Sequence, residues 1–277
     1  MKYCIVQGVL SEDKDLISKI ESKGKIIYEV IRIINGVPLF FKEHMCRLEH
    51  TYKIMNIEFI CSHKIILGYI RELCVANSIL EGNIKIIISS LSREYALYFI
   101  PHVYPTEEQY DCGVRTILYY GERNNPNAKV QDNDFRNRVM NKVAESNAYE
   151  AILVDRNGYI TEGSKSNIFM VKNNLVMTAP INGVLPGITR LKIMEVINKM
   201  GITLEERYIH ENNLKEVDAL FISGTSPKIL PINSVNNLKF DCENNIIRGI
   251  MKEFEICIKK DIDNLMDVDS KGKLIIK

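Results

Sequence analysis

The residues whose types and spacing suit a chemical site are concentrated in one short part of the chain. A carboxylate, Glu162, opens the segment EGSKSNIF, and an apolar strand ending at Thr178 follows. The segment LPGITR then begins a helix after Gly187, where the backbone N–H groups of Ile188 and Thr189 and a threonine hydroxyl suit a phosphate. This combination favours a bound, phosphorylated cofactor that carries a ring nitrogen.

A second hydroxyl-rich turn supports the same interpretation. Thr225 and Ser226 lie in SGTSP, directly after an expected strand over residues 220–223. Each of the two turns, taken alone, is also typical of an ordinary helix cap or chain reversal. Their joint presence in one half of the chain is what favours a phosphate site.

The first 120 residues are expected to form an α+β unit, an antiparallel sheet with helices on one side. Asn35-Gly36 is a strong hairpin signal between two apolar runs, and helical spacing of apolar residues follows the second run. The expected strands are 26–34, 37–41, 84–88, 95–100 and 114–120, and the expected helices are 42–57 and 62–77.

The polar segment GERNNPNA, residues 121–128, is the expected linker, because it carries glycine and proline after a strand. The predicted domains are therefore residues 1–120 and 129–277. The second is expected to be rich in β-structure and decorated by helices. Its expected helices are 133–147, 188–200 and 246–259, and its expected strands include 159–161, 202–208 and 219–223.

Composition excludes several classes of function. With 277 residues, 46% of them hydrophobic, the chain is long enough to bury the cores of two domains. Lysine and arginine total 36 against 35 acidic residues, so neither a nucleic-acid partner nor a membrane-surface role is expected. The N-terminus lacks a signal-peptide pattern, and no apolar run is long enough to span a bilayer. A cytoplasmic protein is expected.

The cysteine and histidine residues give no sign of a metal site. The seven cysteines are scattered and never spaced as C-x-x-C, and the five histidines show no H-E-x-x-H pattern. These spacings disfavour both a disulfide framework and a zinc site, and they fit small buried side chains in a reducing compartment. No bound metal is expected.

Several of these residues match a known signature. The chain resembles the class IV aminotransferases, the fold-type IV enzymes that use pyridoxal 5'-phosphate. The matching residues, in order, are Glu162, Asn167, Phe169, Thr178, Leu185, Gly187 and Arg190. The resemblance implies an α+β fold of two domains, a smaller α/β domain with an antiparallel sheet and a larger β-barrel-like domain with helices. It also implies a homodimer whose small-molecule partners are an amino acid and a 2-oxo acid.

The resemblance also implies a catalytic residue. In the family, a lysine lies just after the linker and before a helix that leads to a strand resembling YEAIL, and Lys129 stands at that place. Such a lysine forms the internal Schiff base and carries the proton between the substrate Cα and the cofactor C4'. Lys165, inside EGSKSN, is a rival by sequence, but this position varies in the family and is expected to face solvent.

The cofactor-binding residues follow by the same matching. Glu162 is expected to bond the pyridine nitrogen and keep it protonated, and Leu185 to lie against the ring. Arg47, in EHMCRL, matches the family pattern EHxxRL, whose arginine reaches the cofactor phosphate from the smaller domain. The implied phosphate site comprises Arg47, Ile188, Thr189, Thr225 and Ser226.

The substrate side of the resemblance is weaker. Tyr28, in IIYE, matches an active-site aromatic residue of the family. Arg93 is a candidate for the substrate carboxylate from a shifted position, and a solvated turn arginine is the alternative. Family members usually carry G-D-G before the Tyr28 position, whereas only Gly24 is present here. An unusual substrate pocket is therefore expected, and Arg190 is expected in a structural ion pair.

Three functions remain open at this point. The first is an aminotransferase that moves an amino group from an amino acid to a 2-oxo acid. The second is an aminodeoxychorismate lyase, which uses the same lysine and glutamate and releases pyruvate. The third is a non-catalytic relative that binds pyridoxal phosphate. The intact LPGITR favours transamination, because the lyases often lack its threonine.

Overall fold

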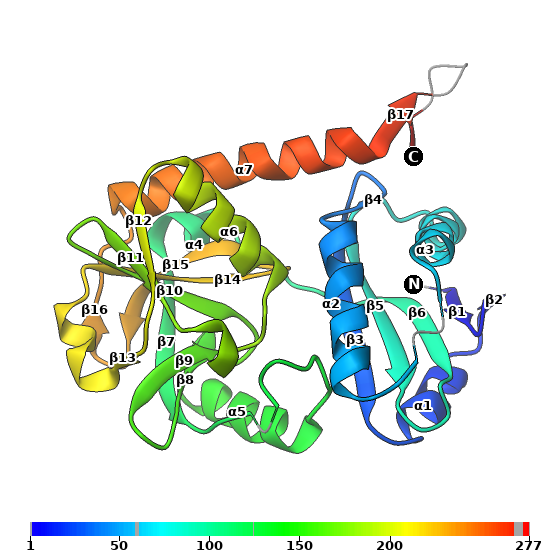
Figure 1. The fold of residues 1–277 in the computed structure, drawn as a ribbon, viewed down its shortest axis with the longest axis horizontal. Coiled ribbons are helices and arrows are strands. Elements are labelled where there is room, and N and C mark those ends of the chain that lie inside the picture. The colour runs from blue at the N-terminus through cyan, green and yellow to red at the C-terminus, as the bar shows by residue number, and fades with distance from the viewer. Residues whose placement is uncertain (1, 59–60, 124, 269–273, 277) are drawn as a thin grey trace. The chain divides into compact units, whose positions relative to one another are not determined.

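A computed structural model of the chain describes residues 2–58, 61–123, 125–268 and 274–276. These residues form two compact units, each built on its own β-sheet (Figure 1). Unit 1 comprises Met1–Val103, Ala128–Gln131 and Ile258–Lys277. Unit 2 comprises Tyr104–Asn127 and Asp132–Cys257. The predicted α+β class is confirmed.

Unit 1 contains, within the described residues, an antiparallel sheet of six strands in the order β2-β1-β6-β5-β3-β4. Asn35 and Gly36, with φ of 53° and 78°, join β3 to β4, so the predicted hairpin is confirmed. The second strand is shorter than expected, because Phe40 adopts a left-handed conformation and a helix begins at Phe41. The strands are β1 (Cys4–Val6), β2 (Val9–Ser11), β3 (Ile26–Ile34), β4 (Val37–Pro38), β5 (Gly82–Ser89) and β6 (Tyr95–Ile100).

Helices cover both faces of this sheet, and the expectation of helices on one side was wrong. Side chains alternate between the two faces along β3. Ile27 and Ile31 pack in the core that α2 and α3 share, whereas Ile26 packs with Ile20 of α1 in a separate cluster. The sequence reading missed α1 altogether. The helices are α1 (Asp15–Glu21), α2 (Phe41–Ile54) and α3 (His63–Asn77).

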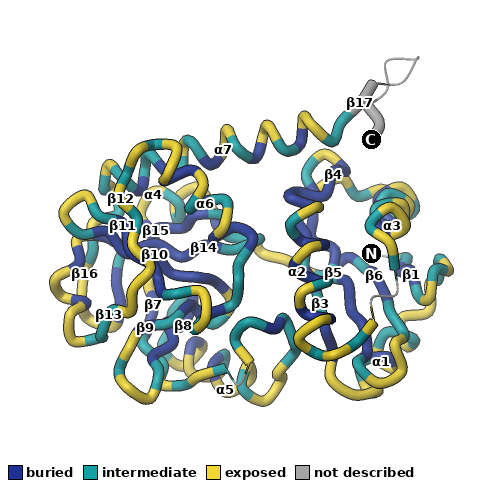
Figure 2. The backbone as a smooth tube through the Cα atoms, viewed as in Figure 1, coloured by how far each residue is buried: buried dark blue, intermediate teal, exposed yellow. Residues whose placement is uncertain are grey.

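Unit 2 contains a curled, mixed sheet, to which the described residues contribute ten strands (Figure 1). Its path runs β12-β11-β10-β14-β15-β7-β8-β9-β13, and β16 pairs with β15. The central strands are almost entirely buried (Figure 2). The strands are β7 (Val114–Tyr120), β8 (Glu150–Val154), β9 (Tyr159–Gly163), β10 (Asn167–Lys172), β11 (Leu175–Thr178), β12 (Thr203–Glu206), β13 (Ile209–His210), β14 (Ala219–Gly224), β15 (Lys228–Val235) and β16 (Leu238–Lys239).

Helices of unit 2 pack on this sheet, and α6 lies against β12 and β14. The last helix, α7, continues from unit 2 into the final segment of unit 1. A two-stranded sheet of β17 (Met266–Val268) and β18 (Leu274–Ile276) follows it. The helices are α4 (Glu107–Cys112), α5 (Asn133–Glu145), the 3-10 helix η1 (Ile181–Gly183), α6 (Ile188–Lys199), the 3-10 helix η2 (Glu211–Glu216) and α7 (Asn245–Leu265).

The observed units divide the chain differently from the expected domains. β7 was expected in the first domain, but it pairs in parallel with both β8 and β15 and so belongs to unit 2. Ala128–Gln131 belongs to unit 1, because the Gln131 N–H donates to the Ile26 carbonyl at 2.8 Å. The expected linker, residues 121–128, includes residue 124, which lies outside the described residues.

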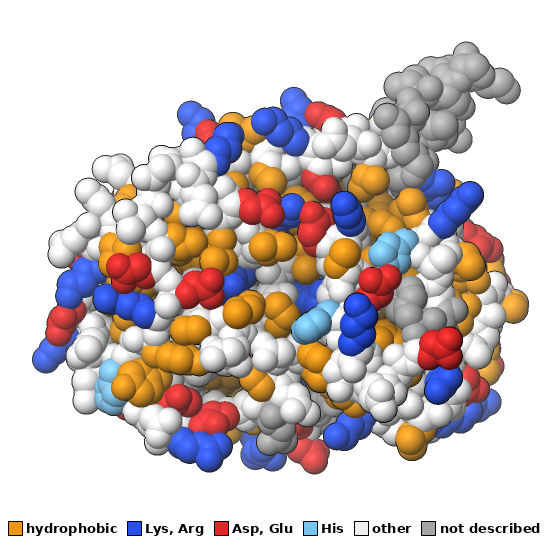
Figure 3. Space-filling view, viewed as in Figure 1, with side chains coloured by type: hydrophobic (Ala, Val, Ile, Leu, Met, Phe, Trp, Pro, Cys, Tyr) orange, Lys and Arg blue, Asp and Glu red, His pale blue; other side chains and the backbone are white. Residues whose placement is uncertain are grey.

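Charged side chains of both signs are interspersed over the face of the molecule in Figure 3. In the described ranges, no helix combines the length and the apolar character needed to cross a membrane. The same residues contain no group of three or more metal-ligating side chains.

Candidate active site

Lys129 is held in unit 1 by its backbone. Its carbonyl accepts the N–H of Tyr28 at 3.1 Å, and the neighbouring Val130 bridges to Ile27 of β3. Its own N–H donates to the hydroxyl of Thr51 at 3.4 Å. The segment that carries Lys129 is therefore fixed along β3 and against α2, although the sequence alone assigned it to the second domain.

The Tyr28 ring lies beside two lysine side chains. The Nζ atom of Lys129 is 4.8 Å from the ring centroid, and the Nζ atom of Lys85 is 5.5 Å from it. Both distances suit a cation–π interaction. The structure thus brings the predicted catalytic lysine together with the predicted substrate aromatic, and it adds Lys85, which also contacts Glu21 at 3.2 Å and Gln131 at 2.9 Å.

Arg47 is buried in unit 1 and bound by a carboxylate that the sequence analysis did not consider. Its Nε donates to Glu29 Oε1 at 2.8 Å, and its Nη2 donates to Glu29 Oε2 at 2.7 Å. The Nδ1 atom of His44 lies 2.8 Å from the same Glu29 Oε2. These side chains come from β3 and α2 and form one buried cluster.

The charge states of this cluster follow from its burial and its partners. Burial alone would raise the pKa of Glu29, but the positive charge and hydrogen bonds of Arg47, with His44, lower it to about 2. Burial lowers the pKa of His44, and the hydrogen bond to Glu29 only partly opposes this. At neutral pH the cluster therefore contains an ionised Glu29, a cationic Arg47 and a neutral His44.

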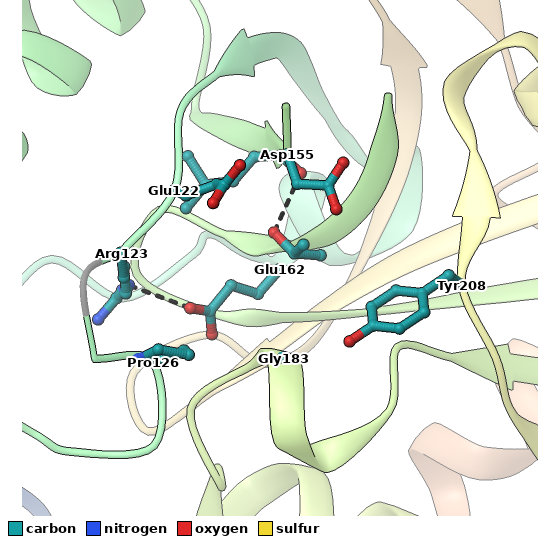
Figure 4. Close-up of a pocket in the computed structure, with 9 residues that line it drawn as sticks. Glu122, Arg123, Pro126, Asp155, Glu162, Gly183 and Tyr208 are labelled. Atoms are coloured by element: carbon teal, nitrogen blue, oxygen red, sulfur yellow. Dashed lines mark hydrogen bonds and ion pairs between the residues drawn. The ribbon is translucent and has the colours of Figure 1, made fainter. Parts of the chain in front are cut away.

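Glu162 is a buried carboxylate of β9 in unit 2, with 2% of its surface exposed. Its Oε1 lies 3.0 Å from the Nε of Arg123, an ion pair that Figure 4 shows. Its Oε2 accepts the N–H of Leu185 at 3.1 Å and lies 3.4 Å from the Nδ2 of Asn167. These contacts fix the position of the carboxylate at the centre of the signature segment.

A cavity of about 220 Å³ adjoins this ion pair in unit 2. Glu162 and Arg123 line it together with Glu122, Asp155 and Tyr208 (Figure 4). Glu122 binds Arg156, with Nε at 2.9 Å from one carboxylate oxygen and Nη2 at 2.9 Å from the other. The side chain of Glu162 is thus next to an open, polar space.

The turn that follows Glu162 is organised by a second buried carboxylate, Glu150 of β8. Its Oε1 accepts the Lys165 N–H at 2.6 Å and the Ser166 hydroxyl at 2.9 Å. Burial raises the pKa of Glu150, and these hydrogen bonds offset the effect only in part. The side chain of Lys165 is exposed, as expected, and its hydrogen bond to Glu150 comes from the backbone N–H.

The start of α6 is shaped as an anion site would require. Gly187 is the N-cap residue and no side chain caps the helix, while Ile188 and Thr189 form its buried first turn. The uncapped N–H groups and the helix dipole favour a negative group at this end. The structure therefore places both predicted residues where backbone donors are available.

The second predicted turn follows β14 directly. Thr225 and Ser226 are half-buried residues of this turn. Ser223, at the end of β14, is opposite Asn167 in the sheet register. The Ser223 hydroxyl is buried, and among the described residues it has no hydrogen-bond partner.

Arg93 does not join the cluster around Lys129 and Tyr28. It lies in the turn after β5 with a φ of 59°, its side chain is 54% exposed, and its ion-pair partner is Glu58 at 4.0 Å. This geometry agrees with the alternative that the sequence left open, a solvated turn arginine.

Arg190 forms the structural ion pair that was predicted for it. Its Nη2 lies 2.8 Å from Glu206 Oε2 and donates to the carbonyl of Ala179 at 2.9 Å. The pair joins α6 to β12 and thereby fixes the helix whose first turn is described above.

Sequence reasoning missed Glu29, Thr51, Arg123 and Glu150. A signal for Glu29 was present, because it shares an otherwise apolar face of β3 with Ile27 and Ile31, and an acid there needs a buried partner. Glu150 in YEAIL gave a similar signal. Arg123 lies in an irregular segment, where no periodicity predicts which way a side chain points.

The residues of unit 2 fit a phosphorylated pyridine. The buried carboxylate of Glu162 suits a ring nitrogen that carries a proton. The uncapped start of α6 suits phosphate oxygens, and so does the Ser223 hydroxyl, which has no hydrogen-bond partner in the described part of the chain. Unit 1, taken by itself, holds a lysine amine and a buried guanidinium, which are kinds of group that suit an aldehyde and a phosphate.

The known proteins to which this chain is similar include two aminotransferases and a putative lyase. D-alanine aminotransferase from Bacillus licheniformis is 28% identical over 250 residues, which cover 84% of this chain and 88% of that protein. The solved structure of the Escherichia coli branched-chain amino acid aminotransferase matches with a TM-score of 0.82 at 23% identity, covering 99% of this chain and 98% of that one. A putative 4-amino-4-deoxychorismate lyase from Legionella pneumophila matches with a TM-score of 0.76 at 20% identity, covering 84% and 91%.

At these identities the two solved structures show the fold alone, and they confirm the predicted two-domain, fold-type IV architecture. The model of the family Amino-transferase class IV matches residues 26–235, which is most of the chain. The chain therefore belongs to the class IV aminotransferases, as its signature residues predicted.

Proposed function

We propose that this enzyme transfers an amino group from an amino acid to a 2-oxo acid, with Lys129 as its catalytic residue. Enzymes of this family use pyridoxal 5'-phosphate. The proposal rests above all on Lys129, whose backbone is fixed by β3 and Thr51 and whose Nζ lies 4.8 Å from the Tyr28 ring centroid. A reactive amine held this way has a restricted range of positions, as proton transfer requires.

The other residues have distinct tasks in this proposal. When bound, pyridoxal phosphate supplies a ring that accepts electrons as the substrate loses its Cα proton. Lys129 would tether the cofactor and move that proton, and Glu162 would hold a proton at the ring nitrogen. Leu185 would lie against the ring. The phosphate would bind Arg47, Ile188, Thr189, Thr225 and Ser226.

Substrate binding is proposed for Tyr28, which is half-buried and lies beside Lys129. Arg93 is the weaker candidate, since its side chain is exposed and pairs with Glu58. A panel of L- and D-amino acids, each tested for a change in the cofactor spectrum, identifies the donor and its stereochemistry. The homodimer implied by the resemblance stays a prediction, and sedimentation velocity tests it.

The central test is the covalent attachment of the cofactor. The purified protein should show a visible absorption band with pyridoxal phosphate, and borohydride reduction followed by peptide mapping should place the pyridoxyl group on Lys129. Lys129→Ala should lose both the band and the half-reaction with an amino acid. Lys165→Ala, a matched lysine variant within the signature, should keep both; a band that survives in Lys129→Ala refutes the assignment.

The lyase is the second candidate, supported by the use of the same lysine and glutamate. It differs from an aminotransferase in needing no acceptor for the amino group. Pyruvate formed from aminodeoxychorismate without any added 2-oxo acid would favour the lyase. Conversion of a 2-oxo acid to its amino acid, with a stoichiometric loss of the donor, would favour the aminotransferase.

A further inference from the structure

Glu29 is a fully buried carboxylate on an otherwise apolar face of β3 in unit 1. It is 0% exposed and lies on the same face of β3 as Ile27 and Ile31, which belong to the core that α2 and α3 cover. An ionised group at such a position loses its hydration, and hydrogen-bonded partners must compensate for that loss. An isoleucine would continue the alternation of the strand without this cost, so packing alone does not explain the glutamate.

The partners of Glu29 hold one guanidinium in a defined plane. Arg47 donates from Nε to Oε1 at 2.8 Å and from Nη2 to Oε2 at 2.7 Å, which is a two-point contact between planar groups. His44 lies 2.8 Å from Oε2 and supports the carboxylate from the preceding turn of α2. A side chain bound at two of its nitrogens cannot rotate freely, so Glu29 sets the plane of the Arg47 guanidinium.

The same turn of α2 is linked to the predicted catalytic lysine. The Thr51 hydroxyl donates to the Arg47 carbonyl at 3.1 Å and accepts the Lys129 N–H at 3.4 Å. Thr51 is fully buried. The Arg47 guanidinium and the Lys129 backbone are therefore both held by residues of β3 and α2.

We infer that Glu29 is a positioning residue, which fixes the Arg47 guanidinium in the orientation that receives the phosphate of pyridoxal phosphate. The inference rests on the proposed function, in which Arg47 binds that phosphate. A long side chain that is already ordered loses little rotamer entropy on binding an anion, whereas a mobile arginine loses more. Glu29 thus contributes to affinity for the phosphate group and not for the pyridine ring.

Titration with two cofactor forms tests this separation. The apoprotein, Glu29→Gln and Glu29→Asp are each titrated with pyridoxal phosphate and with pyridoxal, which lacks the phosphate, by absorbance. In Glu29→Gln the Kd for pyridoxal phosphate should rise about tenfold or more, equivalent to about 1.4 kcal/mol, while the Kd for pyridoxal changes less than about twofold. Glu29→Asp keeps the negative charge and shortens the side chain, so its loss of affinity for pyridoxal phosphate should be smaller than that of Glu29→Gln.

Two controls separate positioning from a general effect on folding. Glu49→Gln removes an acid from α2, the helix that carries Arg47. The partner of Glu49 is His63, at 2.7 Å, so this variant should leave the affinities for both cofactor forms unchanged. In an Arg47→Met background, Glu29→Gln should cause no further loss of affinity for pyridoxal phosphate, because the group that it orients is gone.

Three results overturn the inference. These are an unchanged affinity of Glu29→Gln for pyridoxal phosphate, an equal loss for both cofactor forms, and additive losses in the double variant. Failure of the proposed function is seen separately, in the wild-type titration: a wild-type protein that binds no pyridoxal phosphate refutes both proposals. Glu29→Asp keeps the test open if the glutamine variant does not fold.

Discussion

Gly187 lies against Asn167 so closely that a methyl group added to the glycine would overlap Asn167 Oδ1. The Asn167 amide in turn donates to the Leu185 carbonyl at 3.0 Å and lies 3.4 Å from Glu162 Oε2. The glycine is therefore required for a close approach that supports the buried carboxylate, and not for an unusual backbone angle, since its φ is −64°.

Gly187→Ala should displace the Asn167 amide and weaken its support of Glu162. We expect a loss of stability of about 1–3 kcal/mol, the usual cost of overpacking a tight contact. The affinity for pyridoxal phosphate should fall as well, because α6 begins at the next residue. Urea unfolding and an absorbance titration measure the two effects. A variant as stable as the wild type, with unchanged affinity, would mean that the contact relaxes freely.

Gly68→Ala should raise the stability, in contrast to Gly187→Ala, because there is space for a methyl group at this position. Gly68 is an exposed residue in the interior of α3, and apart from its chain neighbours and the backbone of its own helix, no atom of the described residues lies within 4 Å of an added Cβ. Alanine should raise the stability by about 0.5–1 kcal/mol, because it restricts the unfolded chain and favours the helix. The same urea experiment tests this, and a destabilised Gly68→Ala would contradict the expectation.

Replacing Arg190 should cost more stability than replacing Glu206, its partner in the ion pair. Arg190 is 4% exposed, whereas the Glu206 side chain is 39% exposed. Arg190→Met leaves the Ala179 carbonyl without this donor and should cost about 1–3 kcal/mol. Glu206→Gln keeps a hydrogen-bond acceptor at a half-exposed site and should cost less. A double-mutant cycle in urea gives the coupling, and equal losses in both single variants would contradict this asymmetry.

The sequence predicted the elements better than it predicted the units. β6 and β7 begin and end where expected, because their apolar runs are bounded by turn residues. α1 was missed, since seven residues give too few turns for a clear helical period. The unit boundaries depend on which strands pair across long separations, and the parallel pairing of β7 with β15 leaves no local signal.

For the candidate site, motif matching proposed residues but not their partners. Lys129, Arg47 and Glu162 were chosen by their place in the signature, yet each one is held by a residue that the sequence did not single out. Thr51 binds the Lys129 backbone, and Glu29 binds Arg47. Such partners come from other elements, so spacing along the chain carries no information about them. Arg93 was chosen because an arginine suits a substrate carboxylate, but its side chain lies exposed in a turn.

The buried Glu150 gives the enzyme a stability that depends on pH. Burial raises the pKa of Glu150 above its ordinary value of 4.5, so the folded state holds this proton more tightly than the unfolded state does. Its contribution is fully present below pH 4.5 and declines as the pH rises through 4.5 toward the raised value. At neutral pH the folded state is destabilised, because Glu150 must ionise while it is buried away from water.

Glu150→Gln isolates this effect, because glutamine cannot ionise and still offers an oxygen to the Lys165 N–H. The free energy of unfolding of the variant, relative to the wild type, should increase as the pH is raised above 4.5 and stay constant below it. Urea unfolding of both proteins at a series of pH values measures this difference in the free energy of unfolding. The contributions of groups that titrate alike in the two proteins cancel in the difference. Parallel pH profiles would show that the Lys165 and Ser166 donors hold the pKa of Glu150 at its ordinary value.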